Sequence, residues 1–247
     1  WYQQKFLDED RLDIKLGQQS LDQEFMVSEN ALLFVNTMFG WPMLPSADLP
    51  GGGPAYPLSA LGLRLRARPI NSLTILAGIF NGSPVASNEG DPQQQNPSGT
   101  GFPVNGGQLA IAELQYSYPA LGSVVYPGEA QSLSRTYRIG AWYDTEDFAD
   151  QRFDTTGVSL ASTASSGHPL LHHGNYAFYA VADQMVWVYD RDTNRNLSVF
   201  CRVMGTPAAD RNLVDFSMNA GFVLHQPLRY RNADPEGIVV AVTQRLM

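Results

Sequence analysis

Charged residues, cysteines and long apolar runs are all scarce in this sequence. Only 16% of its 247 residues are charged, whereas about a quarter is usual for a soluble domain. The formal net charge is −8, with 16 lysines and arginines, so we do not expect the basic face that nucleic-acid binding requires. The one cysteine, Cys201, excludes an intrachain disulfide bond and a cysteine-rich metal site.

The sequence contains no run of roughly eighteen or more apolar residues, so it predicts no transmembrane helix. A membrane protein is not thereby excluded. The strands of a transmembrane β-barrel give a weaker signal, namely segments of roughly ten residues with alternating polarity.

Signatures of enzymatic chemistry are also missing. We find no G-x-S-x-G motif, no H-E-x-x-H motif and no Walker-type lysine after the glycines at 51–53. His168, His172 and His173 are close enough in sequence to suggest a metal site. They have no nearby cysteine and few flanking carboxylates, so we interpret them as residues of a loop surface. We therefore expect no catalytic residue, no metal and no cofactor.

Alternating polarity extends along the whole sequence and predicts ten β-strands. A strand tilted by about 45° needs roughly nine to eleven residues to cross a bilayer, whereas strands of soluble proteins usually have about five or six. Most of the predicted strands are long enough to cross. They are residues 1–7, 11–19, 58–68, 73–81, 108–118, 135–144, 176–189, 197–204, 215–224 and 238–245.

The connections between these strands alternate in length. Such alternation is typical of the short periplasmic turns and long outer loops of a membrane barrel, although a connection of intermediate length, 119–134, interrupts it. In residues 22–39, which lack strict alternation, we expect one or two helical turns. The short connections are 8–10, 69–72 and 190–196, and the long ones are 20–57, 82–107 and 145–175.

One face of the predicted strands is apolar and the other is polar. In LGLRLRAR at 61–68 the leucines share one face, and Arg64, Arg66 and Arg68 share the other, about 7 Å apart per step. In a membrane barrel the apolar face meets lipid and the arginines line the lumen; in a soluble β-sandwich they form a solvated outer face. The other residues predicted to line the lumen are Asp13, Glu113, Arg138, Trp142, Asp144 and Arg202.

Two roles are open for Trp142, which lies between Arg138 and Asp144 on the polar face. Sugars are recognised by stacking on aromatic rings and by hydrogen bonds from planar groups such as guanidinium and carboxylate, so the indole can serve as a platform for a sugar. Alternatively, it fills space against an inward-folded loop. Residues 73–81, which are apolar on both faces, are expected to pack partly against such a loop.

Several blocks of the sequence resemble the carbohydrate-selective porin family (OprB-like) and occur in the same order. The resemblance spans nearly the whole chain. It implies an all-β fold, namely a transmembrane antiparallel up-and-down β-barrel of sixteen strands, trimeric or monomeric. It also implies a constriction narrowed by inward loops and lined with arginine and acidic residues. The blocks are FGWP at 39–42, SADLPGGGPAYP at 46–57, LGLRLRARP at 61–69, GAWYDT at 140–145, GNYAFYAVADQMVW at 174–187 and DRNLVDF at 210–216.

We expect residues 1–247 to form a single, incomplete β-barrel porin domain. About ten of the sixteen implied strands are present, and lipid does not tolerate open sheet edges. Further strands are therefore expected before Trp1 and after Met247. The long connection 20–57 is expected to fold into the lumen.

The predicted function is a channel in the bacterial outer membrane for passive, sugar-preferring diffusion of small carbohydrates into the periplasm. Its predicted partners are small sugars and outer-membrane lipid, not nucleic acid, and no enzymatic activity is expected. Two alternatives remain: a general diffusion porin of the same fold without sugar selectivity, and a soluble β-sandwich that binds carbohydrate.

Overall fold

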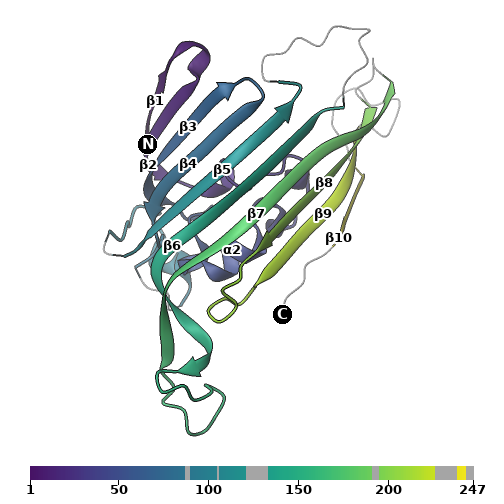
Figure 1. Cartoon of the computed structure of the whole chain (residues 1–247). Coiled ribbons are helices and arrows are strands. Elements are labelled where there is room, and N and C mark those ends of the chain that lie inside the picture. Colours follow the sequence, from purple (N-terminus) through teal and green to yellow (C-terminus); the bar gives the residue numbers. More distant parts are fainter. Residues whose placement is uncertain (87–89, 105, 121–132, 191–194, 226–237, 243–247) are drawn as a thin grey trace.

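The computed structural model describes residues 1–86, 90–104, 106–120, 133–190, 195–225 and 238–242. In this part of the chain ten antiparallel strands form one sheet, and each strand pairs with the next one along the sequence. β1 and β10 are the two edges of the sheet (Figure 1). The strands are β1 (Tyr2–Phe6), β2 (Leu12–Gln19), β3 (Ala60–Ile70), β4 (Leu73–Asn81), β5 (Gln108–Tyr118), β6 (Arg135–Asp154), β7 (Pro169–Asp190), β8 (Arg195–Gly205), β9 (Phe216–His225) and β10 (Ile238–Val242).

The predicted all-β, up-and-down arrangement is confirmed, and the predicted strands occur in the predicted order. Most strand ends lie within about two residues of the predicted ones. Residues 243–245 of the last predicted strand lie outside the described residues.

β6 and β7 are the exception, because both continue well past the predicted ends. The prediction of a long connection at 145–175 is therefore wrong over most of its length. After a register shift between Asp144 and Asp147, pairs such as Phe148 with His172 continue the ladder. Figure 1 shows this extension projecting from the rest of the sheet.

The tip of the extension is organised by one buried carboxylate. Asp154 accepts hydrogen bonds from the backbone N–H groups of Thr156 (2.9 Å), Val158 (2.9 Å) and Ser166 (2.7 Å). These bonds stabilise the charged form, with that from Ser166 contributing most, and hold the pKa of Asp154 well below its usual range.

Residues 20–57, called the inner segment below, cover one face of the sheet, which we call the inner face. Figure 1 shows α2 of this segment behind the strands. The helical turns expected in residues 22–39 are present. None of the helices in the described residues is long and apolar enough to cross a membrane. The short helices are η1 (Asp8–Asp10), η2 (Leu21–Gln23), η3 (Ala31–Leu33), α1 (Thr37–Gly40), α2 (Met43–Asp48), η4 (Pro50–Gly52) and α3 (Pro92–Gln95).

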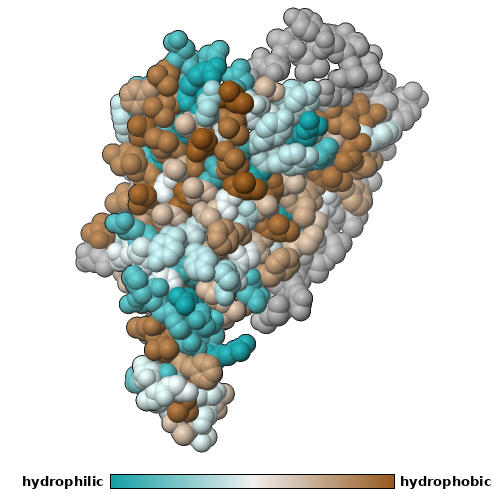
Figure 2. All heavy atoms as spheres, in the orientation of Figure 1, coloured by the Kyte–Doolittle hydropathy of each residue, from teal (hydrophilic) through white to brown (hydrophobic). Residues whose placement is uncertain are grey.

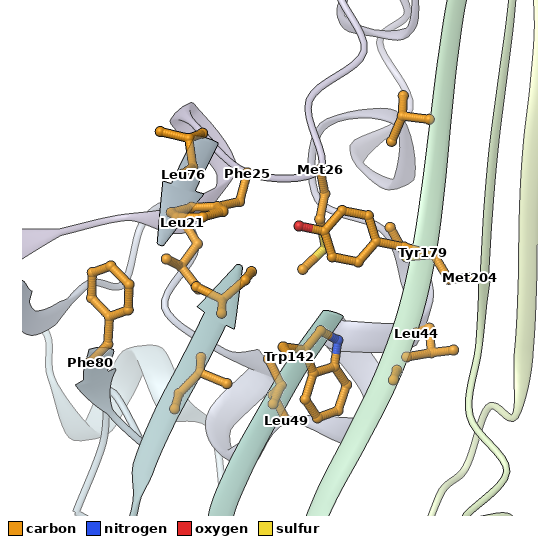
Figure 3. Close-up of a cluster of buried hydrophobic side chains, with 14 of the residues drawn as sticks. Leu21, Phe25, Met26, Leu44, Leu49, Leu76, Phe80, Trp142, Tyr179 and Met204 are labelled. Carbon is orange, nitrogen blue, oxygen red and sulfur yellow. The ribbon is translucent and has the colours of Figure 1, made fainter. Parts of the chain in front are cut away.

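A buried hydrophobic cluster joins the inner segment to the inner face (Figure 3). Leu21, Phe25 and Leu44 of the segment pack in this cluster with side chains of β4 to β8. The rings of Phe25 and Phe80 meet edge to face, with 6.4 Å between centroids. Such a contact contributes about 0.5–1.5 kcal/mol beyond the buried area. The inner face of β4 is therefore apolar because it packs against the inner segment, as predicted.

The opposite, outer face carries exposed apolar side chains (Figure 2). On β3, Leu63 and Leu65 are exposed while Arg64 between them is buried, so the predicted alternation is confirmed. A face of this kind is unfavourable in water and is what lipid requires. The apolar residues exposed on this face include Leu16, Leu63, Leu65, Ile75, Ile79, Leu114, Tyr116, Tyr137, Ile139, Tyr143, Phe178, Phe216, Met218 and Phe222.

The membrane position of the outer face can be tested with two residues of equal exposure. Ile139, within the ten-stranded part of β6, and Leu171, in the extension, are each 59% exposed. We expect Ile139→Arg to destabilise the folded protein by about 2–4 kcal/mol in lipid, and Leu171→Arg by about 1 kcal/mol at most. Urea titration of the full-length protein in vesicles measures both. Equal losses would contradict the assignment of the outer face to lipid.

Candidate functional site on the inner face

Asp13 lies between two of the three arginines of the LGLRLRAR segment. Its Oδ1 accepts a hydrogen bond from Arg64 Nη1 and its Oδ2 accepts one from Arg66 Nη2, each at 2.7 Å. The register causes this contact, because Asp13 of β2 pairs directly with Arg66 of β3. Arg68 instead donates to the backbone carbonyls of Glu9 and Asp10, in the turn between β1 and β2.

Glu24 of the inner segment completes this charged cluster. It accepts from Lys15 Nζ and from Arg64 Nη2, both at 3.1 Å. Arg64 is thereby shared between two carboxylates, and only 3% of its side chain is exposed, against 34% for Arg66. Of the three arginines, Arg66 and Arg68 are partly open to solvent and Arg64 is not.

A second cluster is centred on Glu113 of β5. Its Oε2 accepts from the Met26 N–H (2.7 Å) and from the Tyr179 hydroxyl (2.9 Å). Gly140 lies between Glu113 and Tyr179 in the register. A Cβ at position 140 would come within 2.4 Å of the Tyr179 ring. Glycine is therefore required for this ring to cross β6 and reach the carboxylate.

Asp183 of β7 links the inner segment to Arg138 of β6. Its Oδ2 accepts from Arg138 Nη1 at 3.2 Å. Its Oδ1 accepts from the Ser28 hydroxyl at 2.6 Å and from the Asn30 side-chain amide at 3.0 Å. Both lone-pair-rich oxygens of this carboxylate are therefore used to hold other side chains in place.

Arg202 of β8 is fully buried beneath the inner segment. Its guanidinium donates to the backbone carbonyls of Met26 (3.0 Å), Met38 (2.6 Å) and Phe39 (3.2 Å). It also donates to Asn219 Oδ1, its neighbour on β9. The guanidinium, a planar group with five N–H donors, thus connects the chain at Met26 and the turn at Met38 and Phe39 to the sheet.

Trp142 packs with Leu44 and Leu49 of the inner segment (Figure 3) and is 2% exposed. Of its two predicted roles, the structure shows the filling of space against an inward-folded segment, and its ring is not available for stacking. Asp144 is also fully buried, with its Oδ1 accepting from the Glu146 N–H at 2.9 Å.

All nine residues predicted to line the lumen come from the expected face of the sheet. Most of them are covered by the inner segment or by each other, and only Arg66 and Arg68 stay partly exposed. Their contact with a solute stays a prediction. Sequence reasoning missed Glu24, Ser28, Asn30 and Asp183 as polar partners, because their roles depend on how the inner segment folds. The buried members are Asp13, Arg64, Glu113, Arg138, Trp142, Asp144 and Arg202.

Two of the histidines interpreted as loop residues lie on β7 instead. His172 Nε2 is 2.8 Å from Asp150 Oδ2, and His173 Nδ1 is 3.0 Å from Asp147 Oδ1. These contacts join β6 to β7 within the extension.

Asp48, the last residue of α2, fixes the inner segment near the start of β9. Its Oδ1 accepts from the backbone N–H groups of Leu213 (3.0 Å) and Val214 (3.1 Å). Burial raises the pKa of Asp48 to about 7, against the effect of these two hydrogen bonds and with a small contribution from Asp215. Its other oxygen is buried without a hydrogen-bond partner among the described residues.

This pKa makes the attachment of α2 dependent on pH. Because the folded pKa is above the unfolded one, the stabilisation is complete below about pH 4 and is lost as pH rises through about 7. We expect a loss of about 1–3 kcal/mol between pH 5 and 8, most of it below pH 7, and much less in Asp48→Asn, whose amide oxygen still accepts. Hydrogen exchange at Leu213 and Val214 of the full-length protein measures it; a wild-type rate independent of pH, once corrected for intrinsic exchange, would contradict the burial.

Replacing Arg202 should loosen the inner segment, because several buried carbonyls lose their donor at about 1–3 kcal/mol each. In Arg202→Met we expect faster proteolysis within residues 20–57 of the full-length protein. The control is Arg152→Met, since Arg152 is exposed in the extension. If both variants leave the segment equally protected, Arg202 does not hold it.

Comparison with known proteins agrees with this architecture. Residues 1–246 match the model of the carbohydrate-selective porin, OprB family. The solved high-pH structure of OprB from Pseudomonas putida is similar over 97% of this chain, with a TM-score of 0.72 and 24% sequence identity. The chain spans about half of that protein, 52% of its length. No curated protein sequence matches.

Proposed function

Because this chain belongs to the carbohydrate-selective porin family, we propose that it forms part of the wall of a bacterial outer-membrane channel. Small sugars would diffuse through the channel passively into the periplasm. The β-barrel fold and the apolar outer face suit a membrane position, and the single sheet in the described residues argues against the β-sandwich alternative.

The observation that carries the proposal is the inner face, where guanidinium and carboxylate groups are paired and only partly open. Arg66 keeps a third of its side chain in solvent while bound to Asp13, and Glu24 keeps 22% exposed beside Arg64. Groups of this kind donate to and accept from sugar hydroxyls. Because each of these charged groups already has a partner, it would bind a sugar weakly enough for the sugar to be released, as conduction requires.

The inner segment would narrow the passage. Polar contacts with β2, β3, β5, β7 and β8 and the hydrophobic cluster hold it against the inner face of the sheet. In this proposal Arg66, Arg68 and Glu24 face the sugar. The other predicted residues act by holding the segment at a fixed position.

The role of the open arginines is testable by sugar flux. We expect the double variant Arg66→Ala/Arg68→Ala of the full-length protein to change glucose uptake in liposome swelling by about two- to tenfold and to weaken anion preference, because charged hydrogen-bond donors are lost. Arg152→Ala, an exposed arginine of the extension, serves as the control. If flux and ion preference both stay at the wild-type values, these arginines do not lie on the pathway.

The same assay separates a sugar-preferring channel from a general porin. Glucose should enter faster than a zwitterionic amino acid of similar size, and equal rates would favour the general porin.

A further inference from the structure

A polar cavity of about 570 Å³ lies on the inner face, apart from the arginine cluster. It is found at the end of the sheet where β5 ends and β6 begins. Ser117, Thr136 and Ser198 line its wall, and Glu29 and Asn30 of the inner segment line its other side. Its volume is within the range of roughly 300–1,000 Å³ that is usual for small-molecule sites.

The strand register builds the wall of this cavity. Ser117 pairs with Thr136, and Thr136 pairs with Asp183, so three polar residues follow one another across β5, β6 and β7. Serine and threonine are small, which leaves space that the longer side chains of the neighbouring rows would fill. Asp183 also holds Ser28 and Asn30, so the side formed by the inner segment is fixed in place.

The lining suits an uncharged sugar. Each serine or threonine hydroxyl both donates and accepts, and the Asn30 amide offers both functions as well, which matches the hydroxyls of a pyranose. Leu33, Met185 and Tyr118 add apolar surface for the C–H faces of the ring. Arg135 lies over the Tyr118 ring, 4.6 Å from its centroid. Glu29 opposes the entry of an anionic solute, whereas Asp183 is already paired with Arg138.

We infer that this cavity is a second binding site, for a neutral pyranose, at the exit from the narrowed passage. The inference depends on the proposed function. The tight turn η1 and the two-residue link between β3 and β4 lie at this same end of the sheet, and short connections of outer-membrane barrels face the periplasm. A sugar leaving the inner segment would bind here before release, and the site prefers neutral sugars over sugar phosphates or uronic acids.

The test is block of ion current by sugar in the full-length protein in planar bilayers, with glucose added to one side at a time. We expect Thr136→Val/Ser198→Ala to raise the half-blocking glucose concentration at least threefold from the side of the short connections and to leave it nearly unchanged from the other side. Thr74→Val removes a buried hydroxyl of the inner face outside the cavity and should leave both values unchanged.

A second variant tests the choice of solute without altering the wall. Glucuronate should block less than glucose from the side of the short connections, and Glu29→Gln should reduce that difference. Folding of each variant is checked by its heat-modifiable gel shift. Unchanged block in both variants, while wild-type protein still conducts glucose, would overturn the exit site alone. No glucose flux in the wild type would overturn the proposed function as well.

Discussion

A charged side chain removed from water must be hydrogen-bonded or paired, and this requirement organises the inner face. An uncompensated buried charge costs several kcal/mol, so each one needs a partner within reach. Arg64, Glu113 and Arg202 each take part of their partners from the inner segment. If the inner segment moved away, these buried charged groups would lose hydrogen-bond partners. This cost holds the segment in one position.

The hydrophobic cluster and the charged contacts act on different parts of the same segment. Leu44 and Leu49 bury apolar surface against Trp142. This burial stabilises the packing of the segment on the sheet, but hydrophobic contacts do not fix its orientation, because they are not directional. The hydrogen bonds from Arg202 and to Asp183 have defined geometry and fix which turn lies where. Most of the charged side chains on the inner face of the described residues are paired in this way.

The sequence predicted the strands and their faces well, because alternation is a local property of the pleated backbone. It did not predict the extension of β6 and β7, since a register shift between Asp144 and Asp147 breaks the alternation where the extension begins. Nor could it show which inward residues are covered. Arg202 meets Met26 across 176 residues, and Trp142 has the same alternation whether it is open or covered. Alternation along a strand shows which face of the sheet a side chain is on. Whether that side chain is buried depends on residues far away in the sequence.

The distance along the chain between the inner segment and its partners has a consequence for assembly. The segment is synthesised directly after β2, yet Asp183, Arg202 and Val214 belong to β7, β8 and the approach to β9. Contacts so far apart in sequence form late. Before those strands have paired, Leu21, Phe25 and Leu44 lack most of the side chains that they pack against. An incompletely folded chain therefore exposes an apolar stretch. This stretch stays exposed until the sheet has formed as far as β8 and the residues just before β9.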